Sequence, residues 1–541
     1  MARGAALTIA PPAGHRRVLP WPGLLALAVV VAVLGTAAAG LVAAAGHGAS
    51  LPRLDYVFGL LRFTAFQAAL STVLSLLAGA LVALALARRT RFPGRPLLTA
   101  VLNLAIVLPS IVVVLGIVAV FGRAGWLAEA LRALGLGPRS WLYGLPGILI
   151  AHVFFNAPLV ARILGAALAS VPADEWRLAR HLGLPPAAVF RLIDLPVLAR
   201  ELPGAAALVF LLCFTSFAAV LALGGGPGTA TLEVAVYEAL RFEADFGRAA
   251  VLAAIQIGVT GVLAALALGA GRRAATTLPS GVAAVRPDAE SATLRWLDRT
   301  VLLAAVLFLG SPVLAVLGKG LPELASLARP AVGEALRASL VVAIPAGLLA
   351  SLGGLGLSLL TRTLDSAGRH GAARLVRTGT LGALAVPPIA LSAGLFVALR
   401  PVADPFALGP AAIIAVNALM TLPFAMRLVE PAVLRAGARY GRLAESLGVT
   451  GLARLRLVEA PLVAQPLGVA FAIAAAFSLG DLGAAAFFGT GGFVTLPVLL
   501  YQRLGAYRTD EAAAVALLLA TLVLALFALA ALATRRHREA G

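Results

Sequence analysis

Long apolar runs recur along the whole chain and leave only short polar stretches between them. Hydrophobic residues make up 61% of the 541 residues and charged residues only 12%, values far outside the range of soluble domains. A helix needs about 20 apolar residues to cross a bilayer, and the runs recur often enough for about twelve such helices. We therefore predict an all-α polytopic membrane protein with little room for a soluble domain.

The expected membrane spans follow from hydropathy in windows of about 19 residues. They cover residues 21–45, 57–87, 97–121, 143–168, 203–223, 249–270, 300–318, 337–361, 379–400, 410–430, 463–486 and 512–534. The first run has a basic start and small residues near its end, so a cleaved signal peptide is the alternative. Its length and the even number of spans favour a membrane helix.

The distribution of basic residues predicts the orientation of these spans. If the N-terminus is inside, most of the 43 Lys and Arg residues fall in loops on the cytoplasmic side, including residues 88–95 and Arg535, Arg536 and Arg538. Both termini are then predicted to be cytoplasmic. The net charge of +19 is explained by this topology and by anionic membrane lipid, and nucleic acid is not an expected partner.

A sequence of twenty residues occurs twice in the chain. RLARHLGLPPAAVFRLIDLP at 177–196 returns as RLAESLGVTGLARLRLVEAP at 442–461, with Arg, Leu, Ala, Leu, Gly, Arg, Leu and Pro at identical spacing. Every matched pair is 265 positions apart, as Gly448 is from Gly183. Both copies lie in polar stretches between apolar runs, so a water-exposed loop was duplicated together with the spans around it.

The duplication extends over two six-helix halves. Pro158 and Arg162 match Pro423 and Arg427 at the same offset of 265. The polar segment 272–299 has no sustained apolar period and divides residues 1–285 from residues 286–541. Because the loop copies share one orientation, we expect parallel repeats about an axis along the membrane normal, with a translocation path between them.

Each copy of the loop predicts a short amphipathic helix that ends at a glycine. The apolar stripes are Trp176, Ala179 and Leu182 in the first copy, and Tyr440, Leu443, Ala444 and Leu447 in the second. Gly183 and Gly448 end these helices, and Pro196 and Pro461 break the chain before the next span. Such helices could lie on lipid, but two loops with the same Gly-to-Pro separation favour two docking sites for a partner.

The sequence offers no motif for chemistry within the chain. Lys319 is the only lysine, and it lies in an external loop outside any GxxxxGK[ST] frame, so the chain is not predicted to hydrolyse ATP. Cys213 is the only cysteine, and the six histidines form no cluster with metal-ligand spacing. We therefore expect no enzymatic activity, no cofactor and no metal site in this chain.

Both loops resemble the EAA loop of permease subunits of bacterial ATP-binding-cassette (ABC) importers, whose pattern is EAA, three residues, Gly, nine residues, Ile, one residue, Leu-Pro. The residues that fit are Ala179, Gly183, Ile193, Leu195 and Pro196 in the first copy, and Ala444, Gly448 and Pro461 in the second, where Val458 replaces Ile and Ala460 replaces Leu. Both copies lack the opening Glu-Ala.

This resemblance implies how the chain is driven. Coupling loop 1 (residues 172–202) and coupling loop 2 (residues 431–465) would each bind one copy of a separate ATPase subunit, and that subunit would bind ATP and Mg²⁺. The implied mechanism is mechanical: the ATPase dimer closes, the coupling helices move with it, and the helix bundles switch access between the two sides.

Across nearly its whole length the chain resembles the fused, two-half permease of thiamine and thiamine-pyrophosphate importers. The segments that carry this resemblance are FGRAGWL (121–127), AHVFFNAP (151–158), LGGGP (223–227), LEVAVYEAL (232–240), SLGDLGAAAFFG (478–489) and FVTLP (493–497). The resemblance implies the type I importer permease (MetI-like) fold, the bacterial inner membrane, and a periplasmic thiamine-binding protein as partner. The fused permease of ferric-iron importers is the alternative.

Three polar residues are candidates for the translocation path. Asp481 lies at the outer end of the eleventh span, where an acid either lines the path of a cationic substrate or pairs with a structural partner such as an external arginine. Asn156 and Asn417 either join helices by hydrogen bonds or contact the pore.

Two other classes of protein fit the span count. A secondary transporter with two six-helix halves would work without an ATPase and would need intramembrane acids for ion coupling, which are scarce here. Residues 88–95 resemble the basic loop of the major facilitator family but lack its acid. A channel or scaffold is the third hypothesis.

Overall fold

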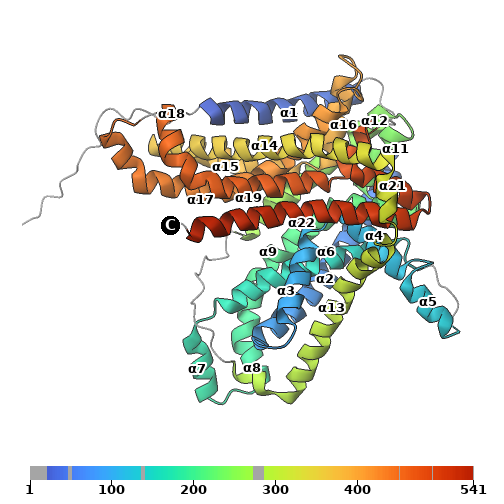
Figure 1. Cartoon of the computed structure of the whole chain (residues 1–541), viewed down its shortest axis with the longest axis vertical. Coiled ribbons are helices and arrows are strands. Elements are labelled where there is room, and N and C mark those ends of the chain that lie inside the picture. The colour runs from blue at the N-terminus through green and yellow to red at the C-terminus, as the bar shows by residue number, and fades with distance from the viewer. Residues whose placement is uncertain are drawn as a thin grey trace, which may run out of the picture.

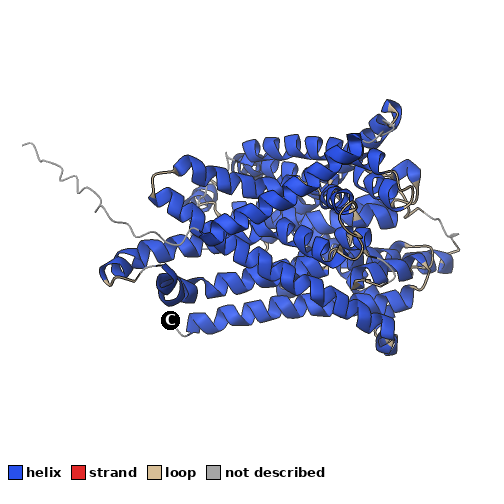
Figure 2. Cartoon of the chain, turned by 90° about the horizontal axis from the view of Figure 1, so that it is seen from above, coloured by secondary structure: helices blue, strands red, loops and turns tan. Residues whose placement is uncertain are grey.

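The computed structural model describes residues 21–46, 52–135, 141–271, 286–449, 451–489 and 492–539. Helices make up the described part and no strand is found there (Figure 2), so the predicted all-α fold is confirmed. Eleven described helices are long and apolar enough to cross a membrane.

The first half contains α1 (Trp21–Gly46), α2 (Leu54–Arg88), α3 (Arg95–Val107), α4 (Ser110–Phe121), α5 (Trp126–Ala133), α6 (Leu145–Ala169), α7 (Ala173–His181), α8 (Pro186–Val189), α9 (Leu195–Phe214), α10 (Ala218–Leu223), α11 (Leu232–Arg241) and α12 (Phe246–Gly271). The second half contains α13 (Ala292–Gly320), α14 (Pro330–Ser366), α15 (His370–Gly382), α16 (Pro388–Leu399), α17 (Gly409–Ser446), α18 (Gly451–Arg454), α19 (Ala460–Leu479), α20 (Gly483–Phe488), α21 (Leu496–Gly505) and α22 (Thr509–Glu539).

Four predicted spans are interrupted in the structure. The span predicted at 97–121 is divided where α3 ends at Val107 and α4 begins at Ser110, after Pro109. The span predicted at 379–400 is divided where α15 ends at Gly382 and α16 begins at Pro388. Proline lacks the backbone N–H and disfavours helical geometry in the residue before it, which explains both divisions. The second division leaves eleven helices of spanning length instead of the predicted twelve.

The other two interruptions lie at equivalent places in the two halves. The spans predicted at 203–223 and 463–486 end early, in α9 and α19, and are followed by the short helices α10 and α20. Residues of α20 are buried throughout, so this broken helix packs inside the protein instead of facing lipid.

The first helix of each half packs against the opposite half. α1 contacts α14 and α16, whereas α13 contacts α2 and α4. Figure 1 shows α1, in dark blue, beside α14, and α13, in yellow-green, beside α2 and α3. A side chain at Gly40 would overlap the backbone of Gly394, so this glycine allows α1 and α16 to approach closely. The two halves are thus interlocked.

Equivalent hydrogen bonds fix the same short helix in each half. The backbone N–H of Leu232, at the start of α11, donates to Thr64 Oγ1 at 3.2 Å. The backbone N–H of Leu496, at the start of α21, donates to Ser339 Oγ at 2.8 Å. α11 and α21 lie at one end of the molecule, and α7, α18 and the C-terminal end of α22 lie at the other (Figure 1). Both coupling loops are therefore on the same side.

Candidate functional site

In coupling loop 1, α7 is a separate helix that ends at a left-handed glycine. Gly183 has φ +58°, and the N–H of Leu184 donates to the carbonyl of Ala179 at 3.0 Å. This geometry is typical of a glycine C-terminal cap, because a side chain at positive φ is strained. The helix has acidic residues in its first turn and basic residues in its last, which suits the helix dipole.

In coupling loop 2, the helix that corresponds to α7 is not a separate short helix. The prediction of one is wrong about where the helix begins, because the segment is the end of the long helix α17. α17 runs without interruption from the membrane to Ser446. Pro172 precedes α7, whereas the position 265 residues later holds Gly437, which keeps its backbone N–H and lets the helix continue. The end is repeated: Gly448 has φ +70°, and the N–H of Val449 donates to the carbonyl of Ala444 at 2.8 Å.

Fewer residues of α7 are buried against the protein than the apolar stripe in the sequence contains. Trp176 and Ala179 are buried, and Trp176 packs with Val171 and Val189 in a small apolar core against which Ile193 also packs. Leu182, the third member of the predicted apolar stripe, is 63% exposed and does not belong to this buried face. The residue lies at the helix terminus, where the chain turns at glycine and the side chain is directed outward.

The inner face of coupling loop 2 differs from the predicted stripe as well. Ala444 is buried, but Leu443 and Leu447 are exposed, and Tyr440 is only half buried. The position equivalent to Trp176 is Gly441, one residue after Tyr440. Tyr440 is therefore not the counterpart of the tryptophan in the first copy.

Exposed leucines form the same outward surface in both loops. Leu178 and Leu182 are 60% and 63% exposed, and their equivalents Leu443 and Leu447 are 55% and 69% exposed. Residues four apart on a helix are neighbours on one face, so each pair forms a single apolar patch. The sequence signal was present, because both positions are leucine in both copies, but burial was needed to show which way they face.

A widened helical turn precedes the repeated proline of each loop. Residues Phe190–Asp194 and Leu455–Glu459 form π-helical turns, in which the next N–H donates to a carbonyl five residues back. Pro196 and Pro461 follow, and both are exposed. A proline supplies no N–H and its ring collides with the carbonyl four residues back, which the wider turn accommodates. The predicted break of the chain at these two prolines is therefore wrong, because the helix continues through them into α9 and α19. Ile193 and Val458 lie half buried within these turns.

A buried ion pair holds coupling loop 1 to the segment that joins the two halves. Asp194 is fully buried and accepts a hydrogen bond from Arg286 at 2.6 Å. Arg286 also pairs with Asp288 at 2.9 Å and lies 4.3 Å from the centre of the Trp176 ring. Burial lowers the pKa of the Arg286 guanidinium, but hydrogen bonds to Asp288 and Asp194 outweigh this effect and raise the pKa above its ordinary value.

The same position in coupling loop 2 carries an acid held by different partners. Glu459, which is 265 residues after Asp194, is buried and pairs with Arg362 of α14 at 2.5 Å and with Arg454 of α18 at 3.3 Å. A side chain at Gly441 would lie 3.3 Å from the Arg454 guanidinium, so the glycine makes room for it. Sequence reasoning missed both acids, although an acid at this place in each copy was a visible signal.

Two arginines at the end of α2 also secure the junction between the halves. Arg88 and Arg89 both pair with the buried Asp298 of α13, at 2.6 and 2.8 Å. The Arg89 side chain also donates to the carbonyl of Ala289 at 2.6 Å. These two members of the basic cluster at 88–95 therefore bind protein and not lipid headgroups.

The two candidate asparagines lie in hydrogen bonds between helices. Asn156 Nδ2 donates to Cys213 Sγ at 3.3 Å, and Asn417 Nδ2 donates to Ser478 Oγ at 2.9 Å. Cys213 and Ser478 are equivalent at the offset of 265, but Asn417 is equivalent to His152, one turn before Asn156. The hydrogen bond therefore joins equivalent helices in the two halves, α6 to α9 and α17 to α19, but the asparagine that donates it lies one turn apart.

Asp481 stabilises the start of a short helix inside the protein. Its carboxylate accepts hydrogen bonds from the backbone N–H groups of Gly483 at 3.0 Å and Ala485 at 3.3 Å. These partners are at the N-terminus of α20, where the backbone N–H groups have no helical acceptor. Asp481 therefore has a structural partner, as one of the two alternatives predicted, and this partner is the backbone of α20 and not an external arginine.

Comparison with known proteins defines the class of this chain. Residues 75–273 match the family described as binding-protein-dependent transport system inner membrane component. The chain is 41% identical over 527 residues to the thiamine transport system permease protein of Brucella abortus, and the match covers 96% of each chain. The corresponding permease of Salmonella typhimurium is 38% identical over 96% of this chain and 97% of its own.

The corresponding permease of Escherichia coli is 39% identical over 87% of this chain and 88% of its own. The chain therefore belongs to the family of thiamine transport system permease proteins. It is a multi-pass membrane subunit of a binding-protein-dependent ABC transport system and not an enzyme. A substrate-binding protein and an ATPase are separate components of such a system.

Proposed function

We propose that the chain translocates thiamine and thiamine pyrophosphate (thiamine diphosphate) across the bacterial inner membrane, from a periplasmic thiamine-binding protein to the cytoplasm. Support for the substrate comes from the relatives, which match nearly the full length of the chain and are named as thiamine permeases. The energy comes from ATP, bound with Mg²⁺ by two copies of the separate ATPase subunit.

The observation that carries this proposal is the repeated leucine surface. Leu178 with Leu182 and Leu443 with Leu447 form two equivalent apolar patches on the same side of the molecule. Uncovered apolar patches of this kind are typical of interaction sites. Because the patches are duplicated, each binds one copy of the same partner, and a pair of ATPase subunits satisfies both.

The fold also supports a cytoplasmic location of both termini. The start of α1 lies against α14 near Gly356, towards the end of α14 that contacts coupling loop 2 through Arg362. The C-terminal end of α22 lies on that side as well (Figure 1). If the coupling loops face the ATPase, both described ends of the chain face the cytoplasm and α11 and α21 face the periplasm.

Rigid attachment lets the coupling loops transmit motion to the membrane helices. When the ATPase dimer closes on ATP, α7 moves together with the ATPase subunit that is bound to it. Because Trp176 and Asp194 both contact Arg286, this movement is passed to α9 and to the start of the second half. In coupling loop 2, α17 continues as one helix from the surface that binds the ATPase into the membrane. The two halves then rotate relative to each other and switch access.

Docking is tested by replacing each leucine pair with serine in the reconstituted transporter. We expect L178S/L182S and L443S/L447S each to raise the ATPase concentration for half-maximal assembly by about tenfold, because apolar contacts at an interface centre contribute about 1–2 kcal/mol. The matched control is L375S, since Leu375 is 71% exposed on α15 outside both loops. Unchanged assembly in both double variants would contradict the proposal.

The substrate is tested by stimulation of ATP hydrolysis in proteoliposomes. Thiamine-loaded binding protein is expected to stimulate hydrolysis and uptake, whereas an iron-loaded binding protein is not. The reverse result would favour the ferric-iron importer. Uptake by the purified chain without any ATPase subunit would favour a secondary transporter.

A further inference from the structure

A pocket of about 430 Å³ lies between the two halves at the end of the molecule opposite the coupling loops. Its walls come from α4 and α10 of the first half and from α13, α21 and α22 of the second. The volume falls within the range of about 300–1,000 Å³ that is typical of small-molecule sites. A ligand here contacts both halves at once.

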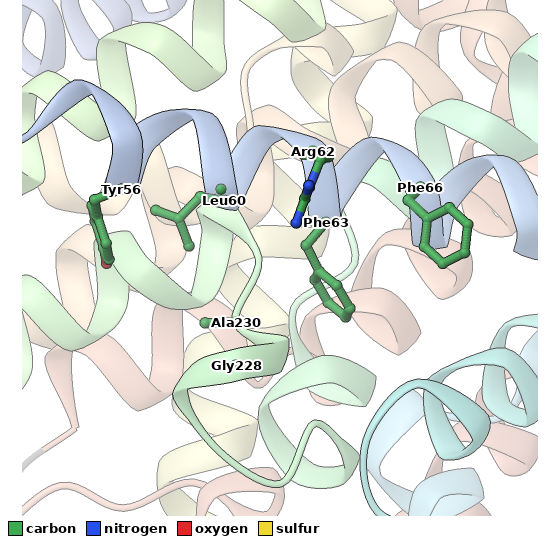
Figure 3. Close-up of a pocket in the computed structure, with 8 residues that line it drawn as sticks. Tyr56, Leu60, Arg62, Phe63, Phe66, Gly228 and Ala230 are labelled. Atoms are coloured by element: carbon green, nitrogen blue, oxygen red, sulfur yellow. The ribbon is translucent and has the colours of Figure 1, made fainter.

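A second cavity differs in this respect. The groove in Figure 3 is lined by Tyr56, Leu60, Arg62, Phe63 and other residues of α2 and by the turn at Gly228 and Ala230, all from the first half. A molecule bound there would not sense how the halves are placed relative to each other. The pocket between the halves is therefore the better candidate for a site on the transport route.

The duplicated sequence shows why the pocket between the halves is open. Val118 on α4 and Ala222 on α10 line it. The equivalent of Ala222 at the offset of 265 is Phe487, and the equivalent of Val118 is Phe396, because both lie nine residues after the proline that precedes their helix, Pro109 before α4 and Pro387 before α16. Those two phenylalanine rings are packed edge to face with centroids 5.5 Å apart, which fills the pseudo-equivalent space. The chain thus contains one open and one filled version of the same position.

The chemistry of the lining is aromatic and cationic. Tyr143, Tyr501 and Tyr507 contribute phenol rings, and Arg123 and Lys319 contribute positive charges. None of the described residues that line the pocket is acidic. Lys319 has one carboxylate nearby, with Nζ 3.5 Å from Asp510 Oδ1, a distance that leaves the ammonium group able to take another anion.

Tyr507 has an unusual backbone conformation at the rim of the pocket. Its φ is +60°, although it is not glycine, and the residue is 89% exposed. Residues with side chains rarely adopt this conformation, and those that do are concentrated at ligand-binding sites. The turn after α21 therefore contributes a large and exposed aromatic side chain to the lining of the pocket.

We propose that this pocket binds a phosphorylated aromatic compound, with its ring against the tyrosines and its phosphate at Lys319 and Arg123. The inference rests on the proposed function, so the ligand is a phosphate ester of the transported vitamin. Free thiamine carries a positive thiazolium ring and no phosphate, and two cations in the lining disfavour it. The pocket thus contributes to uptake of the phosphorylated form and not of free thiamine.

The charge requirement is tested by K319Q in the complete reconstituted transporter. Uptake of thiamine diphosphate, measured as kcat/KM, is expected to fall at least tenfold, because the variant loses a charge-assisted hydrogen bond to the phosphate. Uptake of free thiamine is expected to change less than twofold. The control D510N breaks the same ion pair but keeps the lysine, and is expected to leave diphosphate uptake intact. Equal effects of K319Q on both substrates would overturn the proposal.

The shape requirement is tested by copying the filled half onto the open one. The double variant V118F/A222F places in the pocket the side chains that the second half already accommodates, and uptake of thiamine diphosphate is expected to fall at least tenfold. V29F is the control, because Val29 is 53% exposed on α1, away from the pocket. Full uptake by the correctly folded double variant would overturn the proposal.

The single lysine allows a direct test of binding without transport. Pyridoxal 5′-phosphate is an aromatic phosphate whose aldehyde condenses with a lysine amine to an imine and water, and borohydride reduces the imine to a stable secondary amine. Peptide mapping of the full-length chain is expected to show labelling of Lys319 that thiamine diphosphate prevents and free thiamine does not. Absence of labelling, or absence of protection, would overturn the proposal.

These experiments separate failure of the inference from failure of the proposed function. If the wild-type transporter imports no form of thiamine, the proposed function fails. If it imports thiamine and its diphosphate but K319Q, V118F/A222F and the labelling show no selectivity for phosphate, only the assigned pocket fails.

Discussion

The two coupling loops have the same outer surface but are attached to the protein in different ways. Both present a pair of leucines, end at a left-handed glycine and continue through a widened turn with a buried acid. In coupling loop 1 the acid is held by Arg286 of the connecting segment, and Trp176 packs over that arginine. In coupling loop 2 two arginines of the same half hold Glu459.

This difference distinguishes the residues that the ATPase subunit would contact from the residues that attach each loop to the rest of the protein. The features seen by an identical partner are repeated at the same 265-residue offset, whereas the attachment behind them has diverged. The connecting segment follows the first half directly, and Arg286 within it reaches the buried acid of coupling loop 1. One half is therefore stabilised by the covalent fusion, and the other by its own helices.

The largest effect is expected from removal of the connecting arginine. R286A leaves the carboxylate of Asp194 buried without its partner, which should lower the free energy of unfolding by about 3–5 kcal/mol. Thermal unfolding of the purified chain measures this loss. R286M combined with D194L and D288L replaces all three buried charged groups with apolar ones and should recover most of the stability. A triple variant as unstable as R286A would refute the ion-pair explanation.

A proline at position 437 tests the continuity of α17. G437P removes a helical N–H and introduces a steric collision, so it should cost about 3 kcal/mol and should weaken coupling through the second loop. The reciprocal variant, P172G, is expected to change stability by less than about 1 kcal/mol, because the turn before α7 is held by other contacts. Stability and substrate-stimulated ATP hydrolysis are the measurements. Equal effects of the two variants would show that the two helix starts are not functionally different.

The terminal glycines should respond equally in the two loops. G183V and G448V each place a branched side chain at positive φ, which should cost about 1–3 kcal/mol and uncouple ATP hydrolysis from uptake. G379A is the control, because Gly379 lies within α15 with open space around it. Unchanged uptake and unchanged binding-protein-stimulated hydrolysis in both valine variants would argue against a role in coupling.

The smallest effect is expected from a single arginine of the second loop. R362M removes one partner of Glu459 but leaves Arg454 at 3.3 Å, so the loss should be only about 1–2 kcal/mol. The double variant R362M/R454M should cost more than the sum of the single variants, because only then is the carboxylate uncompensated. Additive unfolding energies would mean that the two arginines act independently.

Several features of the site could be predicted because they depend on the local chain. Gly183 and Gly448 end their helices as expected, since a left-handed terminus requires a glycine wherever the helix packs. Other features depended on distant partners. Leu182 and Trp176 belong to the same apolar stripe in the sequence. Only the packing of Val171 and Val189 against the tryptophan decides that it faces inward while the leucine faces outward.

The amino-acid sequence by itself determined that the chain crosses the membrane many times, that it was duplicated, and where each coupling helix ends. These properties follow from hydrophobicity and backbone geometry, which act over a few residues. Only the tertiary structure decided that Arg286 binds Asp194 across 92 positions, that α1 and α13 pack on opposite halves, and that one interfacial pocket is open while its counterpart is filled. Such pairings depend on which surfaces meet, and many arginines and apolar faces in one chain could meet in other ways.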